Sequence, residues 1–176
     1  MIDLQELVNL IREVNERNCS VSNAVRDYFG RDRHVFYYTG PVKAKERPRS
    51  GKGGRMFTPP ETRKFEKAVN DWAKEQGIKP IGYPIRVALT VFEQTADKAK
   101  LEHGLLGLIY NQKGDVDNLG KSILDGMNGV IYKDDKQITD LRIRRQYSDI
   151  SGFDVIILRS GLTKLEYTNF VKRYNR

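Results

Sequence analysis

The sequence predicts an α+β fold in which helices pack on one side of a mixed β-sheet. Residues 85–91 alternate apolar and polar side chains, as in a strand with one buried face. Residues 118–129 instead place their apolar side chains at helical spacing. Taken along the chain, such patterns give the order β-α-β-β-α-β-β, which indicates helices packed on one mixed sheet.

The main domain is predicted to span residues 35–160. Its first helix begins at Thr58-Pro59-Pro60-Glu61, where proline suits a first helical turn, and ends before Gly77. Residues 43–56 combine glycine, proline and basic side chains, which predicts a mobile loop. The expected elements are strands at 35–38, 85–91, 104–110, 137–147 and 153–159, with helices at 58–76 and 118–129.

Helical segments are predicted on both sides of this domain. Residues 1–34 form an N-terminal extension with an amphipathic helix at 3–17 and a shorter helix after it. Two such helices can form half of a helix-turn-helix, but without a third helix a packing or dimer-forming appendage is favoured. Residues 161–176 form a C-terminal helical tail, and we expect Leu162, Leu165 and Phe170 to face inward.

The composition of the chain indicates what kind of partner it binds and in which cellular compartment it works. The formal net charge of +8 favours a polyanion as partner. No segment has the roughly 20 consecutive apolar residues that cross a bilayer. The acidic, amphipathic N-terminus does not resemble a secretory signal. Cys19 is the only cysteine, so no intramolecular disulfide can form, and we expect a cytoplasmic protein.

The basic residues are clustered. Between positions 43 and 64 there are eight lysines and arginines against two glutamates. Glycines in this stretch would let the backbone approach a phosphate, so we favour a nucleic-acid arm over a merely solvated surface loop. The residues expected to contact DNA are Lys43, Lys45, Arg47, Arg49, Lys52 and Arg55, together with a second cluster of Arg142, Arg144 and Arg145.

Acidic residues are concentrated between positions 115 and 135. This segment carries five carboxylates, which is unexpected in a basic protein because their repulsion must be offset. A bound cation is the usual means of doing so. No cysteine and histidine cluster accompanies these oxygen ligands, so Mg²⁺ or Mn²⁺ is favoured over zinc. The carboxylates are Asp115, Asp117, Asp125, Asp134 and Asp135.

Simpler explanations cover only part of this cluster. Aspartates near a helix start are favourable by about 0.3–1 kcal/mol each, which accounts for Asp115 and, less easily, Asp117. A calcium loop fails because Leu119 and Gly126 would occupy positions that need oxygen ligands. The pair at 134–135 could merely form a turn. A metal site that also uses Lys121 explains all of them together, and its chemistry is phosphodiester hydrolysis.

The spacing of this cluster resembles a known family. The pattern Asp115-x-Asp117-Asn118-Leu119-x-Lys121, followed by Asp125, Gly129 and Asp134-Asp135-x-x-Ile138, is similar to the metal-binding core of the RusA family of Holliday-junction resolvases. The similarity extends over about 36–159 and includes Phe57-Thr58-Pro59-Pro60. It implies that Asp115, Asp117, Lys121 and Asp135 are catalytic and that Asp115, Asp117, Asp134 and Asp135 hold the metal.

The resemblance also implies a function. It indicates a Mg²⁺-dependent endonuclease that acts as a homodimer on four-way DNA junctions and leaves 5′-phosphate and 3′-hydroxyl ends. The segments before residue 35 and after residue 160 are additions to the family pattern, and they would fit a phage or prophage member. Two alternatives stay open: a relaxed nuclease of the same fold that cuts flaps or forks, and a non-catalytic DNA-binding module whose acids only cap helices and form ion pairs.

Overall fold

The computed structural model describes residues 32–50, 54–104 and 115–174. Its elements are β1 (Arg33–Thr39), β2 (Arg49–Ser50), β3 (Met56–Phe57), α3 (Pro60–Glu75), β4 (Ile85–Gln94), α4 (Lys98–Gly104), α5 (Val116–Met127), the 3₁₀ turn η1 (Asp135–Gln137), β5 (Ile138–Ser148), β6 (Gly152–Arg159) and α6 (Lys164–Tyr174). The helices expected within residues 1–31 lie outside the described residues. So does the strand expected at 104–110, except for Gly104, which ends α4.

A four-stranded sheet forms the centre of the fold, with the strand order β1-β6-β4-β5. The two pairs that include β6 are antiparallel, and β4 runs parallel to β5. The sheet is therefore mixed, as predicted. Strands β1 and β5 form its edges, so the arginine-bearing strand β5 has one side without a strand neighbour among the described residues.

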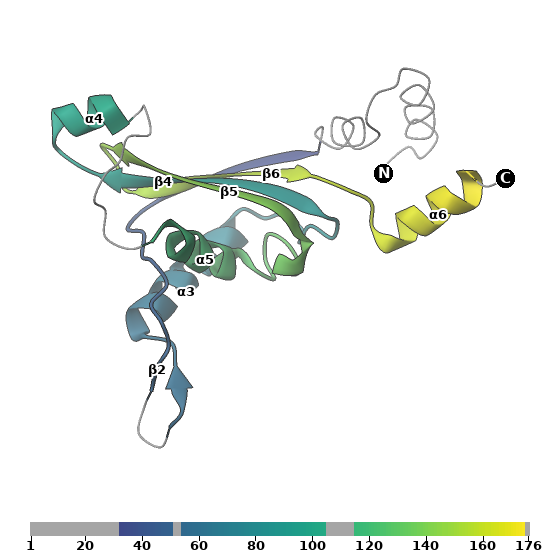
Figure 1. Cartoon of the computed structure of the whole chain (residues 1–176), viewed down its shortest axis with the longest axis horizontal. Coiled ribbons are helices and arrows are strands. Elements are labelled where there is room, and N and C mark those ends of the chain that lie inside the picture. Colours follow the sequence, from purple (N-terminus) through teal and green to yellow (C-terminus); the bar gives the residue numbers. More distant parts are fainter. Residues whose placement is uncertain (1–31, 51–53, 105–114, 175–176) are drawn as a thin grey trace.

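Helices α3 and α5 cover one face of the sheet (Figure 1). The alternating residues of β4 that point toward them, including Val87, Leu89 and Val91, are buried. The apolar stripes of both helices meet these strand residues in one core that contains Val69, Ile123 and Met127. Burial of these stripes is the main source of stability for short helices of this kind. The predicted α+β class, with helices on one side of a mixed sheet, is confirmed.

The two helices approach each other closely at Gly126 of α5. A Cβ atom at this position would lie 2.6 Å from Cβ of Val69 and 2.9 Å from the carbonyl oxygen of Glu66, both on α3. Only glycine leaves room for this contact. It also places Asn70 of α3 within hydrogen-bonding range of α5, where its Nδ2 donates to the Gly126 carbonyl oxygen at 3.1 Å.

The predicted mobile loop at 43–56 contains regular structure. Strands β2 and β3 pair antiparallel, with Arg49 opposite Phe57 and Ser50 opposite Met56. The two strands form a hairpin that projects away from the sheet and from both helices (Figure 1). Glycine and basic residues are poor strand formers, so the pairing of β2 with β3 could not be predicted from the local sequence.

The C-terminal helix α6 differs from expectation in its packing. Leu165, expected to face inward, is 71% exposed. The helix is attached instead through polar contacts at its start, where Arg159 Nη2 donates to Glu166 Oε2 at 2.6 Å and the Thr163 backbone N–H donates to the same oxygen at 2.7 Å. The side chain of Phe170 lies outside the described part of the structure. The domain limits at residues 34 and 160 stay predictions.

Candidate functional site

Asp115 and Asp117 lie at the exposed start of α5. Asp115 is the residue before the first helical turn, with extended backbone angles of φ −80° and ψ 146°. Its side chain caps no backbone N–H of the helix, and its Oδ2 accepts a hydrogen bond from Asn118 Nδ2 at 3.3 Å. Asp117 follows in the first turn and is exposed. A helix start carries a partial positive charge, so it is a favourable place for negatively charged side chains.

Lys121 lies one turn further along α5 and is exposed. Side chains four residues apart share a helix face, so its ammonium group is available on the side of Asp117. Within the described residues, neither Asp117 nor Lys121 takes part in an ion pair. As far as the described residues go, these two opposite charges share a helix face without forming an ion pair, so both can bind an external ligand.

The second aspartate pair belongs to a tight turn. Asp134 begins η1, and its Oδ1 accepts a hydrogen bond from the Lys136 backbone N–H at 2.9 Å. This hydrogen bond holds the pKa of Asp134 below its usual range. Gln137 Oε1 accepts from the Asp134 backbone N–H at 2.9 Å and completes the capping box. Asp134 therefore helps to form the turn. Asp135 is exposed on the same turn, and its side chain interacts with that of Asp134.

These carboxylates do not form a ready-made metal cage. Among residues 32–50, 54–104 and 115–174, no group of three or more aspartate, glutamate, histidine or cysteine side chains is arranged to hold a metal ion. The oxygen chemistry of Asp115, Asp117 and Asp135 nevertheless suits Mg²⁺, which commonly binds through one or two carboxylates and substrate phosphates rather than in a complete protein cage. The assignment of these residues as metal ligands stays a prediction.

Asp125 has a different environment from the other four. It is half-buried and forms an ion pair with Lys45 Nζ, which also lies 3.0 Å from Glu66 Oε1. Burial alone would lower the pKa of Lys45, but its hydrogen bonds to Asp125 and Glu66 outweigh burial, and its pKa is raised. This three-residue cluster joins α3, α5 and the segment before the hairpin. Asp125 therefore has a structural partner within the chain.

The predicted DNA contacts divide into a half-buried group with partners inside the protein and an exposed group. Lys45 is held in the cluster just described, and Arg145 Nε donates to Glu93 Oε1 at 2.6 Å, so the structure gives both side chains partners inside the protein. Lys43 pairs with Glu46 at 3.0 Å but stays 46% exposed. The exposed members are Arg47, Arg55, Arg142 and Arg144. Lys52 and the side chain of Arg49 lie outside the described part.

The segment 41–46 passes across α5 and is fastened to it. The Lys45 backbone N–H donates to the Asn118 carbonyl oxygen at 2.9 Å, and Ser122 Oγ donates to the Lys43 carbonyl oxygen at 2.5 Å. Sequence reasoning did not single out Ser122. A serine on the otherwise apolar, buried side of a helix was the available signal, because a buried hydroxyl requires a partner.

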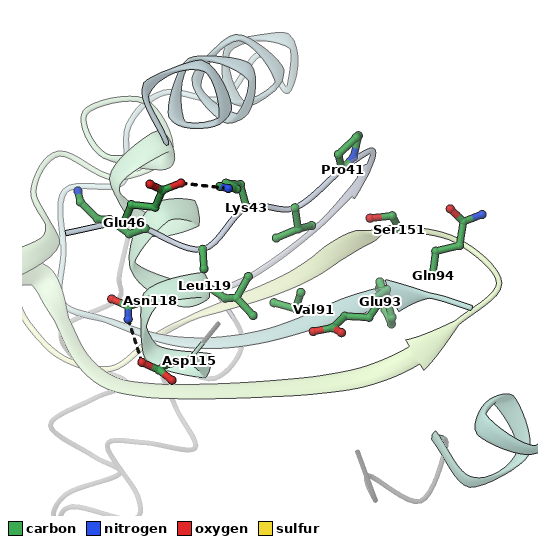
Figure 2. A pocket seen from close by; sticks show the side chains of 14 residues that line it. Pro41, Lys43, Glu46, Val91, Glu93, Gln94, Asp115, Asn118, Leu119 and Ser151 are labelled. Carbon is green, nitrogen blue, oxygen red and sulfur yellow. Dashed lines mark hydrogen bonds and ion pairs between the residues drawn. The ribbon is translucent and has the colours of Figure 1, made fainter. Parts of the chain in front are cut away.

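This fastened segment forms one wall of a pocket of about 890 Å³. Figure 2 shows Asp115 and Asn118 near one end of the pocket, and Gln94 and Ser151 near the other. Between them lie apolar side chains such as Val91 and Leu119. The pocket thus connects the carboxylate at the start of α5 with the ends of β4 and β6.

Comparison with known proteins identifies the family of this chain. A family model described as "Endodeoxyribonuclease RusA" matches residues 39–157, which is more than half of the chain. The chain belongs to the RusA family. The match includes all the predicted catalytic residues, and it ends before α6. The resemblance inferred from the spacing of the aspartates is confirmed.

A curated relative also matches part of the chain. Over 60 residues, the chain is 43% identical to "Uncharacterized protein YqaN" of Bacillus subtilis (strain 168). The matching region covers 34% of this chain and 41% of that relative. In the described residues, no helix is long and apolar enough to span a membrane.

The hairpin and the two exposed arginines of β5 lie on different sides of the RusA-type sheet (Figure 1). Ile143 of β5 packs toward α5, because a Cβ on Gly120 would collide with its side chain. Successive side chains of a strand point to opposite faces, so Arg142 and Arg144 point away from α5. Arg145 shares the face of Ile143 and reaches Glu93 there. DNA that contacted both the hairpin and Arg142 would have to reach both faces of the sheet.

The Lys45 cluster leads to a testable expectation about stability. Replacing Lys45 with methionine should lower the free energy of unfolding by about 1–3 kcal/mol, because two half-buried carboxylates lose their shared cation. Urea denaturation at pH 7 measures this loss. Lys43→Met, which removes an exposed ion pair, is the matched control and should cost at most about 0.5 kcal/mol. Equal losses in the two variants would contradict the structural role of Lys45.

The pH dependence of this contribution has a defined sign. The pKa of Lys45 is raised above its ordinary value of 10.5 in the folded state. Its stabilising contribution is therefore fully present below that value and disappears as the pH rises through the higher folded-state pKa. The difference in stability between the wild type and Lys45→Met should stay constant from pH 6 to pH 9, an interval about 1.5 units or more below the ordinary lysine pKa.

Proposed function

We propose that this chain is a Mg²⁺-dependent endonuclease that resolves four-way DNA junctions. The observation that carries the proposal is the exposed pair Asp117 and Lys121 in α5, neither of which forms an ion pair with another described residue, in a chain of an endodeoxyribonuclease family. A protein that only bound DNA would gain nothing from exposed carboxylates facing phosphates. Asp115 and Asp135 are also exposed, and in this proposal they supply further oxygen ligands when metal and DNA bind.

The reaction is hydrolysis of a phosphodiester bond. A water molecule attacks phosphorus, the bond to the 3′ oxygen breaks, and this oxygen takes a proton, leaving a 5′-phosphate and a 3′-hydroxyl. A divalent cation held by Asp115, Asp117 and Asp135 would activate the water and neutralise charge on the phosphate. The ammonium group of Lys121 stabilises the negative charge that grows on the phosphate oxygens in the transition state. Asn118 orients Asp115 through their hydrogen bond.

Resolution of a junction requires two cuts in opposite strands. One chain carries one set of these residues, so we propose a two-fold symmetric homodimer that presents two equivalent sites. Light scattering should then give a mass near twice the 20.3 kDa of the single chain.

Cleavage of defined substrates tests the function. A synthetic four-way junction, a flap, a fork and a linear duplex of equal length should be incubated with the protein, with Mg²⁺ or with a chelator. We expect paired cuts in the junction with Mg²⁺ and none with chelator. Equal cutting of flaps and forks would favour a relaxed, structure-selective nuclease. Binding without cutting of any substrate would favour a non-catalytic module and would contradict the proposal.

The hairpin should supply affinity rather than chemistry. Arg47 and Arg55 are exposed on it, and each phosphate contact adds about 0.9 to the slope of log affinity against log salt. Replacing both with alanine should flatten this slope by about 2 units and leave the cleavage rate at saturating protein unchanged. Binding titrations between 0.05 and 0.2 M salt, a range of roughly fourfold, measure the slope. Lys67→Ala/Lys74→Ala on α3 is the charge-matched control, and an unchanged slope in the arginine variant would exclude DNA contact by the hairpin.

A further inference from the structure

The hairpin carries two large apolar side chains that are exposed in the described part of the structure. Met56 and Phe57 are adjacent residues of the short strand β3. Met56 is 65% exposed to solvent and Phe57 is 38% exposed. By contrast, the apolar side chains of the central strand β4, such as Val87, Leu89 and Val91, are buried. Adjacent exposed apolar side chains on an element that projects from the body, with basic residues beside them, are suited to contact with an external partner.

The two side chains point in opposite directions. Neighbouring residues of a strand alternate between the faces of the ribbon, so Met56 and Phe57 place one apolar group on each face of the hairpin. A two-stranded ribbon with an apolar group on each side has the shape of a wedge. It can contact two flat apolar surfaces at once, one on each side.

The surrounding charges select the partner. Arg47 and Arg55, on the two segments of this hairpin, are both exposed. An apolar protein surface would not compensate for these charges, whereas DNA offers phosphates next to the apolar faces of its base pairs. Apolar wedges flanked by arginine or lysine are a general means of inserting between bases.

The structure of the DNA decides where insertion is favourable. Within a linear duplex, a wedge must first separate two stacked base pairs, and this unstacking costs free energy. At a branch point, the terminal base pairs of the arms have already lost part of their stacking. The same wedge therefore gains the contact with bases at lower cost at a junction than in a continuous duplex.

We infer that Met56 and Phe57 form a wedge that inserts between base pairs at the branch point of DNA and so gives the protein its preference for branched over linear DNA. This inference rests on the proposed function for the identity of the substrate. It assigns a separate task to the hairpin: the arginines provide affinity for any DNA, and the two apolar side chains provide selectivity for the branch.

Binding in the presence of a chelator tests the wedge without interference from cleavage. The double variant Met56→Ser/Phe57→Ser should lose about tenfold or more of its affinity for a four-way junction, the effect of losing at least one stacked contact. Its affinity for a linear duplex and its salt slope should stay at wild-type values, because the arginines are intact. Leu165→Ser on α6 is the matched control, since Leu165 is 71% exposed but lies away from the hairpin.

A fluorescent base reports the insertion directly. 2-Aminopurine placed next to the branch point should become brighter when the wild-type protein unstacks it, and the same base in the middle of an arm should not. The double variant should lose this signal. A retained signal and a retained preference for the junction would overturn the inference, as would an equal loss of affinity for both DNAs.

The outcomes separate the wedge from the catalytic proposal. If the wild type cuts junctions and the double variant keeps full selectivity, the wedge alone is wrong. If the wild type never cuts but shows the branch-specific fluorescence and the variant does not, the wedge stands and the nuclease proposal fails. If the double variant changes its sedimentation mass, Met56 and Phe57 are buried between copies of the chain, and the wedge is overturned.

Discussion

Replacing Asp117 with asparagine should abolish DNA cleavage while junction binding is kept or improved. The change removes one negative charge from the start of α5 and preserves the shape of the side chain. Loss of the charge weakens the hold on a divalent cation, whereas attraction to phosphates is not reduced. Asp117 is exposed and forms no ion pair with another described residue, so the fold should be unaffected.

Nicking assays and gel-shift titrations on the same junction measure the two effects. Asp140→Asn is the control, because Asp140 is an exposed aspartate of β5 and the charge change is identical. It should cut at the wild-type rate. If Asp117→Asn stays within tenfold of the wild type, a change of only about 1.4 kcal/mol in the barrier, the metal-ligand assignment is wrong.

Lys121→Ala should slow cleavage by about 10²–10³, the usual cost of removing one group that stabilises transition-state charge. The melting temperature should barely change, since the Lys121 side chain is exposed and pairs with no carboxylate in the described part of the structure. Lys121→Arg, which keeps the charge, should retain more activity than Lys121→Ala.

Single-turnover rates and thermal melts of these variants should be compared with Lys74→Ala. Lys74 is an exposed lysine of α3 that lies 3.6 Å from Asp71, and its loss should change neither quantity. A small rate loss in Lys121→Ala together with a large fall in melting temperature would mean that Lys121 supports the helix rather than the reaction.

Much of the fold could be predicted because its signals are local. The alternation over 85–91 and the helical spacing over 118–129 correspond to β4 and α5, since each pattern reflects which side of one element is buried. The predicted start of α5 was two residues late. Asp115 is the residue before the helix, but its side chain forms no capping hydrogen bond with the first turn. The helix start is therefore defined by backbone geometry alone.

The candidate site was predictable in its residues but not in its arrangement. Asp115, Asp117 and Lys121 lie close together in the sequence, at and just before one helix, and their spacing is that of the RusA family, which the family match confirms. The sequence could not reveal that Asp125 belongs to an ion-pair cluster rather than to the exposed set. Its partner Lys45 is 80 residues away, and such a contact arises only when α3, α5 and the 41–46 segment pack together.

The amino-acid sequence by itself determined the α+β class, most of the strands and helices, the family and the residues of the proposed chemistry, because these depend on spacing within short segments. Tertiary structure alone decided which basic residues face outward, separating Arg47 and Arg55 from Lys45 and Arg145. It also exposed Leu165, which sequence periodicity had placed inward, and Met56 on a projecting hairpin. The physical reason is that burial and ion pairing depend on which distant segment packs against a side chain. The residues around that side chain in the sequence do not specify which segment this is.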